Sequence, residues 1–422
     1  MGSAINLCIL AVGDELLGGK VLDTNLAAAA KLLEPAGYRI ALHLTASDAP
    51  GALASLLGGV LRGDFDAATG VGGRIAGVIV CGGLGPTEDD RTRAEVAAAL
   101  GVELEFRDAA WQRIVAHFNR RGATPVANNR RQAFFPATSL ELPNAFGSAP
   151  AFHDQRGERA LWVLPGVPRE FVGLLEHAVL PALRQALPAA PAANSTVTLR
   201  FFGMPESTLD AWVLSHLPQH AVPDYHIYFH ELELEVVLPA EQQALAALAA
   251  TELREKFLGV GSANLSTRLV ALAAEKQLHI VIAESVTGGL ATSLLIEVPG
   301  ASQVLAGAWV TYTDEWKRRE LGVPDDILAR FGAVSEECAA SMAEGARSSS
   351  SADLAVAITG IAGPSGGTPD RPVGLTYVAI ANARNPAQPL VKRFQFAGDR
   401  AMNRIYAAKQ ALFALYRQIM NW

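Results

Sequence analysis

The chain has 422 residues, half of them hydrophobic and 18% charged, which excludes a disordered protein and predicts about two to four folded domains. The net charge of -7, without a long run of lysine and arginine, argues against nucleic acid as the main partner. Three widely separated cysteines show neither a metal-binding spacing nor a disulfide framework.

The N-terminal segment MGSAINLCILAVGDELL is a short apolar run without the basic start or cleavage site of a signal peptide. After it, apolar runs of strand length (INLCILAV, YRIALHLTA, GVIVC, ALWVL) alternate with helical stretches such as NLAAAAKLLEPAG and TRAEVAAALG. This alternation predicts an α/β domain over residues 1–171, with a largely parallel sheet covered by helices on both faces. Ligands of such domains bind beyond the carboxyl ends of the strands.

Two motifs of this domain follow strand ends. AVGDELLGGKVLDTN (11–25) places Asp14 and Glu15 beyond the first strand, and VIVCGGLGPTEDDRTR (78–93) places a glycine-rich turn before Glu88, Asp89 and Asp90. Carboxylates at two strand ends fit a shared divalent ion bound to a pyrophosphate, while the N–H groups of the turn fit phosphate directly. Asp90 fits equally well as the N-cap of the following helix.

Over residues 172–262 the regular alternation of strands and helices stops, which predicts a small α+β connecting domain. A helix (FVGLLEHAVLPALRQAL) leads through a linker to a strand, a helix, the alternating strand HIYFHELELEVVL and a last helix. His226 and His230 fall on one face of that strand. A plain exposed strand face explains them better than a metal-binding pair.

Alternation returns over residues 263–422 and predicts a second α/β domain. In its stretch AESVTGG (283–289), Ser285 follows a strand and Gly288-Gly289 opens a helix. The free N–H groups and the dipole of such a helix end favour an oxyanion, so Ser285 is a candidate nucleophile. The competing interpretation makes Ser285 or Thr287 a simple N-cap.

A nucleophilic serine needs a base. His279 precedes the strand, so a Ser-His-Asp triad is poorly supported, and Lys317 in WVTYTDEWKRRELGV is the alternative. Burial can lower the pKa of a lysine enough for this role. A solvated helix start is the competing interpretation, because Arg318, Arg319 and Glu320 follow.

The segment AITGIAGPSGGTPDRPVG (357–374) carries five glycines and three prolines after a buried strand that Thr359 ends. Such a loop can present backbone amides to a ligand, as phosphate-binding loops do. Arg371, Arg400 and Arg404 are candidates for binding an anion, and each is equally compatible with a surface charge.

Together, ESVTGG, VPGAS, YTDEWK, GAVS, TGIAGPSGG and RPVG resemble the CinA C-terminal domain over about residues 265–420. This is the nicotinamide-nucleotide amidohydrolase family, which converts nicotinamide mononucleotide to nicotinate mononucleotide and ammonia. The resemblance implies that Ser285 is the nucleophile and Lys317 its activator, although Val286 stands where the family usually has cysteine. The implied substrate-binding residues are Glu284, Thr287, Gly288, Gly289, Tyr312, Thr359, Gly360, Gly363, Gly366, Gly367 and Arg400.

We expect the amides near Gly288 and Gly289 to hold the oxyanion, and the glycine-rich loop with Thr359 to take the ribose phosphate. Glu284 is expected to orient Lys317 or Thr287. No cofactor is expected for this reaction.

The first domain also carries a resemblance. GDELL, DTN, GGLGPTEDDRT, NRRQA and LPGVPREF resemble the N-terminal domain of CinA, which is related to the three-layer α/β fold of the molybdopterin-binding MoaB/MogA proteins. The resemblance implies an ADP-ribose pyrophosphatase that depends on a divalent cation (Mg, Mn or Co), with Asp14, Asp89 and Asp90 as its candidate ligands. The implied nucleotide site comprises Asp14, Glu15, Asn25, Gly82, Gly83, Gly85, Thr87, Asp89, Asp90, Asn144 and Gly166.

The sequence thus predicts a cytoplasmic enzyme of pyridine nucleotide recycling with two hydrolytic activities. Its expected partners are pyridine nucleotides and ADP-ribose, without direct nucleic acid or membrane contact, and family analogy suggests a homodimer. Two alternatives stay open: a pyrophosphatase with an impaired amidase domain, and a non-catalytic, competence-associated nucleotide-binding protein.

Overall fold

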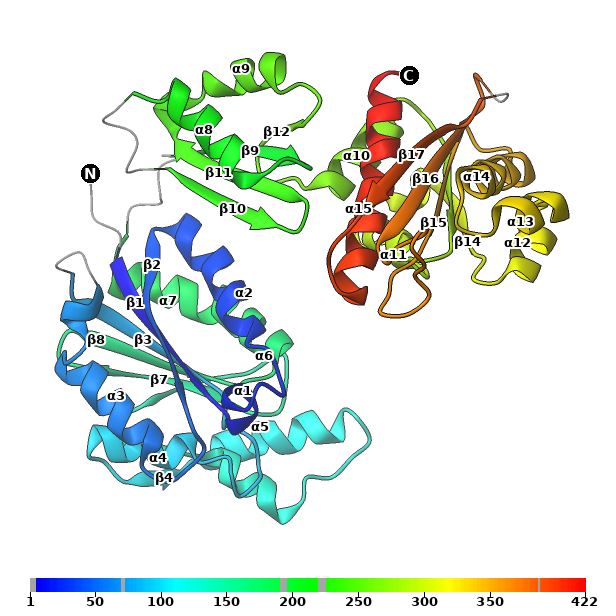
Figure 1. The fold of residues 1–422 in the computed structure, drawn as a ribbon. Helices are drawn as coiled ribbons and strands as arrows, with labels where there is room; N and C mark the ends of the chain where they lie inside the picture. Colours follow the sequence, from blue (N-terminus) through cyan, green and yellow to red (C-terminus); the bar gives the residue numbers. More distant parts are fainter. Residues whose placement is uncertain (1–4, 70–72, 190–195, 219–224, 386–387) are drawn as a thin grey trace. The chain divides into compact units, whose positions relative to one another are not determined.

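The structure is a computed structural model that describes residues 5–69, 73–189, 196–218, 225–385 and 388–422 (Figure 1). The chain divides into two compact units, Met1–Ala193 and Asn194–Trp422. Within the described ranges, no helix combines the length and the apolar character needed to cross a bilayer.

The first unit is built on a six-stranded sheet in the order β2-β1-β3-β8-β7-β6. The strands are β1 (Ile5–Val12), β2 (Tyr38–Ala46), β3 (Ile75–Cys81), β6 (Leu140–Leu142), β7 (Ala151–Arg156) and β8 (Arg159–Leu164). The first four in spatial order are mutually parallel, and β7 and β6 continue the sheet antiparallel. The short strands β4 (Leu104–Phe106) and β5 (Phe134–Pro136) form a separate pair.

Helices cover both faces of this sheet (Figure 1), because alternate residues of its buried strands enter two different cores. In β1, Cys8 and Leu10 belong to one core, while Leu7 and Ile9 belong to the other. The helices are α1 (Asp14–Leu17), α2 (Thr24–Leu33), α3 (Ala52–Arg62), α4 (Thr92–Leu100), α5 (Asp108–Asn119), α6 (Pro168–Leu174) and α7 (Leu180–Ala186). The three-layer α/β prediction is confirmed.

The first unit extends beyond the boundary expected at residue 171. The segment after that residue forms part of α6, a π-helical turn and α7, and its apolar residues pack beneath the first sheet. Leu174, Val179 and Leu183 are fully buried there, in the same hydrophobic core as Leu7 and Ile9. Residues 172–186 therefore complete the first unit instead of opening the next module.

The connecting module (residues 196–260) is an antiparallel sheet in the order β10-β11-β9-β12, covered by two helices. Its elements are β9 (Thr196–Phe202), α8 (Glu206–His216), β10 (His226–His230), β11 (Glu233–Pro239), α9 (Leu245–Glu252) and β12 (Phe257–Val260). The single long strand expected from HIYFHELELEVVL was wrong, because Glu231 has a left-handed φ of 61° and turns the chain into a hairpin.

The C-terminal domain (residues 265–422) has a five-stranded sheet in the order β14-β13-β15-β16-β17. Its strands are β13 (Ile280–Glu284), β14 (Leu305–Val310), β15 (Leu354–Gly360), β16 (Leu375–Asn382) and β17 (Leu390–Gln395). Its helices are α10 (Leu265–Glu275), α11 (Leu290–Ile296), α12 (Asp314–Leu321), α13 (Asp325–Phe331), α14 (Glu336–Ser350) and α15 (Arg400–Met420). Because β14, β13 and β15 are parallel, their carboxyl ends meet at one edge.

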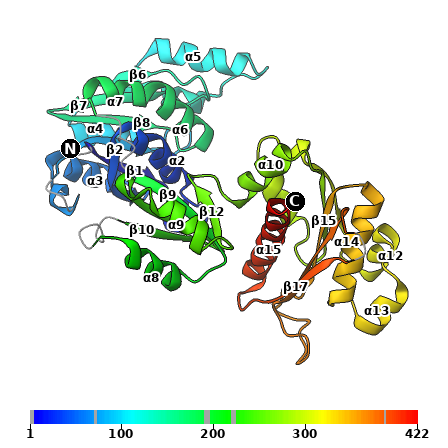
Figure 2. The same cartoon turned by 90° about the horizontal axis from the view of Figure 1, so that it is seen from above.

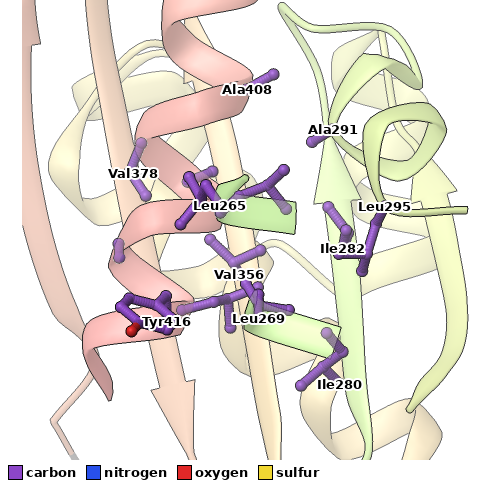
Figure 3. Packing of buried hydrophobic residues seen from close by; sticks show 14 of the residues in the cluster. Leu265, Leu269, Ile280, Ile282, Ala291, Leu295, Val356, Val378, Ala408 and Tyr416 are labelled. Atoms are coloured by element: carbon purple, nitrogen blue, oxygen red, sulfur yellow. The ribbon is translucent and has the colours of Figure 1, made fainter. Parts of the chain in front are cut away.

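Two helical layers enclose this sheet, with α10 and α15 on one face and α12 to α14 on the other (Figure 2). Figure 3 shows side chains of α10, α11 and α15 meeting those of the sheet in the larger core. Phe202 of the connecting module enters this same core and stacks on Phe413 of α15, with ring centroids 4.2 Å apart. This shared core explains why the connecting module and the C-terminal domain form one compact unit.

Candidate functional site

The serine and the lysine singled out in the sequence meet at the carboxyl edge of the second sheet. The Nζ atom of Lys317 lies 3.1 Å from the Oγ atom of Ser285 and donates a second hydrogen bond, 2.8 Å long, to the carbonyl of Thr311. Ser285 follows β13, Thr311 follows β14, and Lys317 belongs to the first turns of α12. Parallel pairing of β13 with β14 therefore brings together two residues that lie 32 positions apart.

The lysine side chain is almost fully buried, with a relative exposure of 1%. Burial lowers the pKa of its ammonium group, because the charged form loses its hydration. No ion pair within the described part of the chain includes Lys317. Nearby, burial raises the pKa of the Cys338 thiol to about 11. The lowered pKa makes the neutral amine easier to form, and the contact with Ser285 places this amine where it can accept the hydroxyl proton.

The carboxylate of Glu284 caps the helix that follows the serine. Its two oxygens accept hydrogen bonds from the N–H groups of Gly289 (2.9 Å), Ala291 (3.2 Å) and Thr292 (2.8 Å), and from the Thr292 hydroxyl (2.6 Å). The expectation that Glu284 orients Lys317 or Thr287 was wrong. The carboxylate is fully buried, and the start of α11 supplies all of its partners.

The main-chain N–H groups left without a partner in the turn between β13 and α11 are not the ones expected from the sequence. The Gly289 N–H bonds to Glu284, and the Gly288 N–H bonds to the carbonyl of Ser285 at 3.2 Å. The N–H groups of Val286 and Thr287 have no hydrogen-bond partner among the described residues. The expected oxyanion donors near Gly288 and Gly289 are therefore occupied, and those of residues 286 and 287 are available.

Two hydroxyl groups beside the pair also lack partners. Thr287 and Thr311 are both fully buried, and their Oγ1 atoms make no hydrogen bond with any residue that the structure describes. Buried hydroxyls normally find a partner. Thr287 follows Ser285 by two residues, and the Thr311 carbonyl accepts a hydrogen bond from Lys317, so both unpaired hydroxyls belong to residues of this site.

Helix α15 ties three parts of the site together. Arg400 donates to the Gly363 carbonyl at 2.9 Å and to the Tyr312 hydroxyl at 3.3 Å. Arg404 donates to the Thr287 carbonyl at 2.8 Å. The glycine-rich loop, the end of β14 and the serine turn thus converge on one helix start. Tyr312 is 58% exposed there and offers an open aromatic face.

Other predicted residues of this site lie further out or are already bonded. The Thr359 hydroxyl is buried and donates to the Ala333 carbonyl at 2.7 Å. A side chain at Gly360 would meet the Leu375 carbonyl at 2.6 Å, so this glycine allows close strand approach. Gly366 and Gly367 lie in the exposed part of the loop. Arg371 donates to the Phe331 carbonyl at 2.7 Å.

The first unit contains a separate cavity of about 450 Å³ at the carboxyl ends of β1, β3 and β8. Of the residues predicted for the nucleotide site, Glu15, Asn25, Gly82, Gly83, Gly85, Asp90 and Gly166 line it. At Gly82, with a φ of 112°, a Cβ atom would lie 2.5 Å from the Val12 carbonyl, so only glycine lets β1 and β3 approach this closely. The cavity matches the location expected from the motifs.

The charged residues that line this cavity are all carboxylates. Glu15, Asp23, Asp90 and Glu170 contribute, while no lysine or arginine of the described chain does. Burial raises the pKa of Glu170, which accepts a hydrogen bond of 2.5 Å from Asn144. Asp23 and Glu170 were not predicted from the sequence. The motif LPGVPREF contains Glu170, but its pattern does not show that this carboxylate faces the cavity.

The remaining predicted residues of this site lie beside the cavity. Asp14 bonds through its N–H to the Asp48 carboxylate, whose pKa is raised by burial and by the nearby charges of Asp14, Glu15 and Asp89. Thr87 donates its N–H and its hydroxyl to Asp90, so this aspartate closes the local turn. In the described ranges, no group of three or more His, Cys, Asp or Glu side chains has a metal-binding arrangement.

Comparison with known proteins finds two family models. One described as "CinA C-terminal domain" matches residues 262–419, and one described as "Probable molybdopterin binding domain" matches residues 8–185. A CinA-like protein of Geobacter sulfurreducens is 37% identical over 99% of this chain and 100% of its own length, and one of Anaeromyxobacter sp. (strain K) is 37% identical over 96% and 97%. A crystal structure of competence/damage inducible protein CihA from Agrobacterium tumefaciens is 38% identical, covering 36% of this chain and 92% of its own, with a TM-score of 0.35.

Proposed function

Since this chain belongs to the family of CinA-like proteins, with a molybdopterin-binding-type domain before a CinA C-terminal domain, we propose that its C-terminal domain deamidates nicotinamide mononucleotide. The observation that carries the proposal is the 3.1 Å contact between the Ser285 hydroxyl and the buried Lys317 amine. A serine beside a neutral amine is an activated nucleophile. A protein that only binds nucleotides has no need of one.

In the proposed reaction, the Ser285 Oγ atom attacks the carboxamide carbon while its proton moves to the Lys317 Nζ atom. Lys317 then gives this proton to the amide nitrogen, the C–N bond breaks and ammonia leaves. Water attacks the resulting ester with Lys317 again as base, which releases nicotinate mononucleotide and restores the serine hydroxyl. A lowered lysine pKa suits these steps, because the amine must be neutral when it accepts the proton of Ser285 and again when it accepts that of the attacking water.

The groups around the pair suit the rest of this substrate. Arg400 and Arg404 supply positive charge for the phosphate, close to the glycine-rich loop and the serine turn. Tyr312 offers a ring for the pyridine. The side chain of Val286 is 7% exposed and packs into the core, so the residue that replaces the family's cysteine has a packing role.

The decisive experiment measures ammonia release from nicotinamide mononucleotide by wild-type protein and by Ser285→Ala. We expect the wild type to release ammonia and the variant to lose nearly all activity. The matched control is Ser207→Ala in the connecting module, which removes the hydroxyl of an exposed serine and should leave ammonia release unchanged. Full activity in Ser285→Ala would refute the proposal.

For the first unit, we propose hydrolysis of the pyrophosphate bond of ADP-ribose in the carboxylate-lined cavity. A doubly charged pyrophosphate would be repelled by Glu15, Asp23, Asp90 and Glu170 unless a cation screened them. Oxygen ligands of this kind suit Mg²⁺, Mn²⁺ or Co²⁺, and since the described residues form no preassembled metal cluster, we propose that the ion enters together with the pyrophosphate. Such an ion would neutralise phosphate charge during the reaction.

The test for this second activity is ADP-ribose hydrolysis with and without a chelator. Activity that disappears with chelator and returns with Mg²⁺, Mn²⁺ or Co²⁺ supports the proposal. Hydrolysis that persists unchanged in excess chelator would show that the carboxylates serve another purpose.

A further inference from the structure

The buried carboxylate of Glu284 is placed unusually for a helix cap. The N-cap residue of α11 is Gly289, which has no side chain, and Glu284 reaches the helix from five positions earlier. Its four hydrogen bonds close a loop of main chain that contains Ser285. Since the carboxylate is fully buried, its charge is balanced by these donors and by the positive end of the helix.

This closure decides which donors remain for the reaction. Glu284 takes the N–H groups of Gly289, Ala291 and Thr292, and the Ser285 carbonyl takes that of Gly288. Along the described turn, only the N–H groups of Val286 and Thr287 are left without a partner. They directly follow the serine, where donors to the oxygen of a tetrahedral intermediate are useful.

The opposite side of the turn is fixed as well. Arg404 and the Leu290 N–H both donate to the Thr287 carbonyl, at 2.8 and 3.4 Å. The peptide unit after residue 287 is therefore held from its carbonyl side, while Glu284 holds the turn from the helix side.

We propose that Glu284 is a positioning residue for the deamidase: it shapes the turn so that the Ser285 hydroxyl faces Lys317 and the N–H groups of Val286 and Thr287 receive the oxyanion. This inference rests on the proposed function. It also explains how valine can stand in place of cysteine at residue 286, because the contribution of that residue to the reaction is its main-chain N–H.

The test is a graded series of variants. Glu284→Gln replaces one accepting oxygen by an NH₂ group that opposes the helix N–H groups, and Thr292→Val removes only the hydroxyl bond. We expect kcat to fall about 100-fold in Glu284→Gln, as displaced reacting groups typically cause, and less in Thr292→Val, with KM little changed. The control is Asn264→Ala, which removes the cap of α10, where Asn264 accepts from the Thr267 N–H.

Three further measurements separate the outcomes. Thermal unfolding shows that the variants are folded at the assay temperature, and the rate at which a fluorophosphonate labels Ser285 reports the position of the serine without any substrate. The pH profile of kcat should keep its shape in Glu284→Gln, because Lys317 keeps its surroundings.

A folded Glu284→Gln with wild-type kcat and labelling rate would overturn the inference, and so would a shifted pH profile, which would mean that Glu284 acts through the charge of Lys317. If the wild type releases no ammonia while the labelling rate still falls in Glu284→Gln, the proposed function fails and the positioning role of Glu284 stands.

Discussion

Replacing Lys317 by methionine should lower kcat for deamidation by orders of magnitude and should change how the stability of the protein depends on pH. Methionine nearly preserves the length of the side chain but lacks the amine that contacts Ser285 and the Thr311 carbonyl. No histidine or carboxylate within the described ranges hydrogen-bonds to Ser285, so no other base can take over. General base catalysis contributes about 10²–10⁴-fold, so kcat should fall by this factor, equivalent to about 3–5 kcal/mol.

The same substitution changes the free energy of unfolding in two opposing ways. Burial of the Lys317 amine lowers its pKa below 10.5, so the unfolded chain binds the proton more tightly than the folded protein does. Each tenfold difference in proton affinity costs about 1.4 kcal/mol of stability below the folded-state pKa. Methionine removes this cost but also loses two hydrogen bonds, to the Ser285 hydroxyl and to the Thr311 carbonyl, each worth about 1 kcal/mol.

The pH dependence of unfolding provides the check. The free energy of unfolding of the wild type should rise with pH between the lowered pKa of Lys317 and 10.5, because the unfolded chain holds the proton over this range. Lys317→Met lacks this rise, so its stability should fall relative to that of the wild type as pH rises. Chemical denaturation of both proteins at about pH 7 and about pH 9 measures this difference in stability. The matched control is Lys276→Met, which loses a partly buried amine bonded to the Ile419 carbonyl. A Lys317→Met protein that stays folded and keeps a substantial part of wild-type kcat would refute the reasoning.

Three other predictions address the remaining groups. Arg400→Met should raise KM for nicotinamide mononucleotide about 10–100-fold, because it loses a charge-assisted hydrogen bond to the phosphate, and should change kcat less. Steady-state kinetics measures both constants, with Arg417→Met, further along α15, as the control. Val286→Cys should lower the free energy of unfolding by about 1 kcal/mol through lost core packing and retain most deamidase activity, measured by denaturation and ammonia release. Asp90→Asn should lower ADP-ribose hydrolysis and leave ammonia release unchanged, which parallel assays of one preparation will show.

The alternating strands and helices made the two α/β domains predictable, because their apolar runs have the length and spacing of buried strands. The run INLCILAV became β1 with the expected ends. The boundary at residue 171 failed for a physical reason: a helix pattern shows which face is apolar but not which sheet that face covers. Only the packing of Leu174 and Leu183 beneath the first sheet decides the question.

Within the sites, too, the sequence pattern does not show which partner a side chain meets. The contact between Ser285 and Lys317 was expected from the family resemblance of ESVTGG and YTDEWK, because the residues alone were equally compatible with a helix cap and a solvated helix start. The partners of Glu284 were not predictable, because a glutamate before a helix suits either an ion pair with a lysine or a cap for the helix. The geometry selects the cap, which occupies the Gly289 amide, while the Ser285 carbonyl occupies that of Gly288, so neither amide is left as an oxyanion donor.

The two candidate sites differ in their electrostatics, and this difference makes their activities separable. The Ser285–Lys317 pair is buried with a lowered lysine pKa and requires no ion for the proposed steps. The cavity of the first unit is lined by four carboxylates, and the pyrophosphate hydrolysis proposed there includes a divalent cation that offsets their charge. Chelator titrated into the full-length protein should therefore remove ADP-ribose hydrolysis at a concentration that leaves ammonia release intact. Parallel loss of both activities would contradict the assignment of metal dependence to the first unit alone.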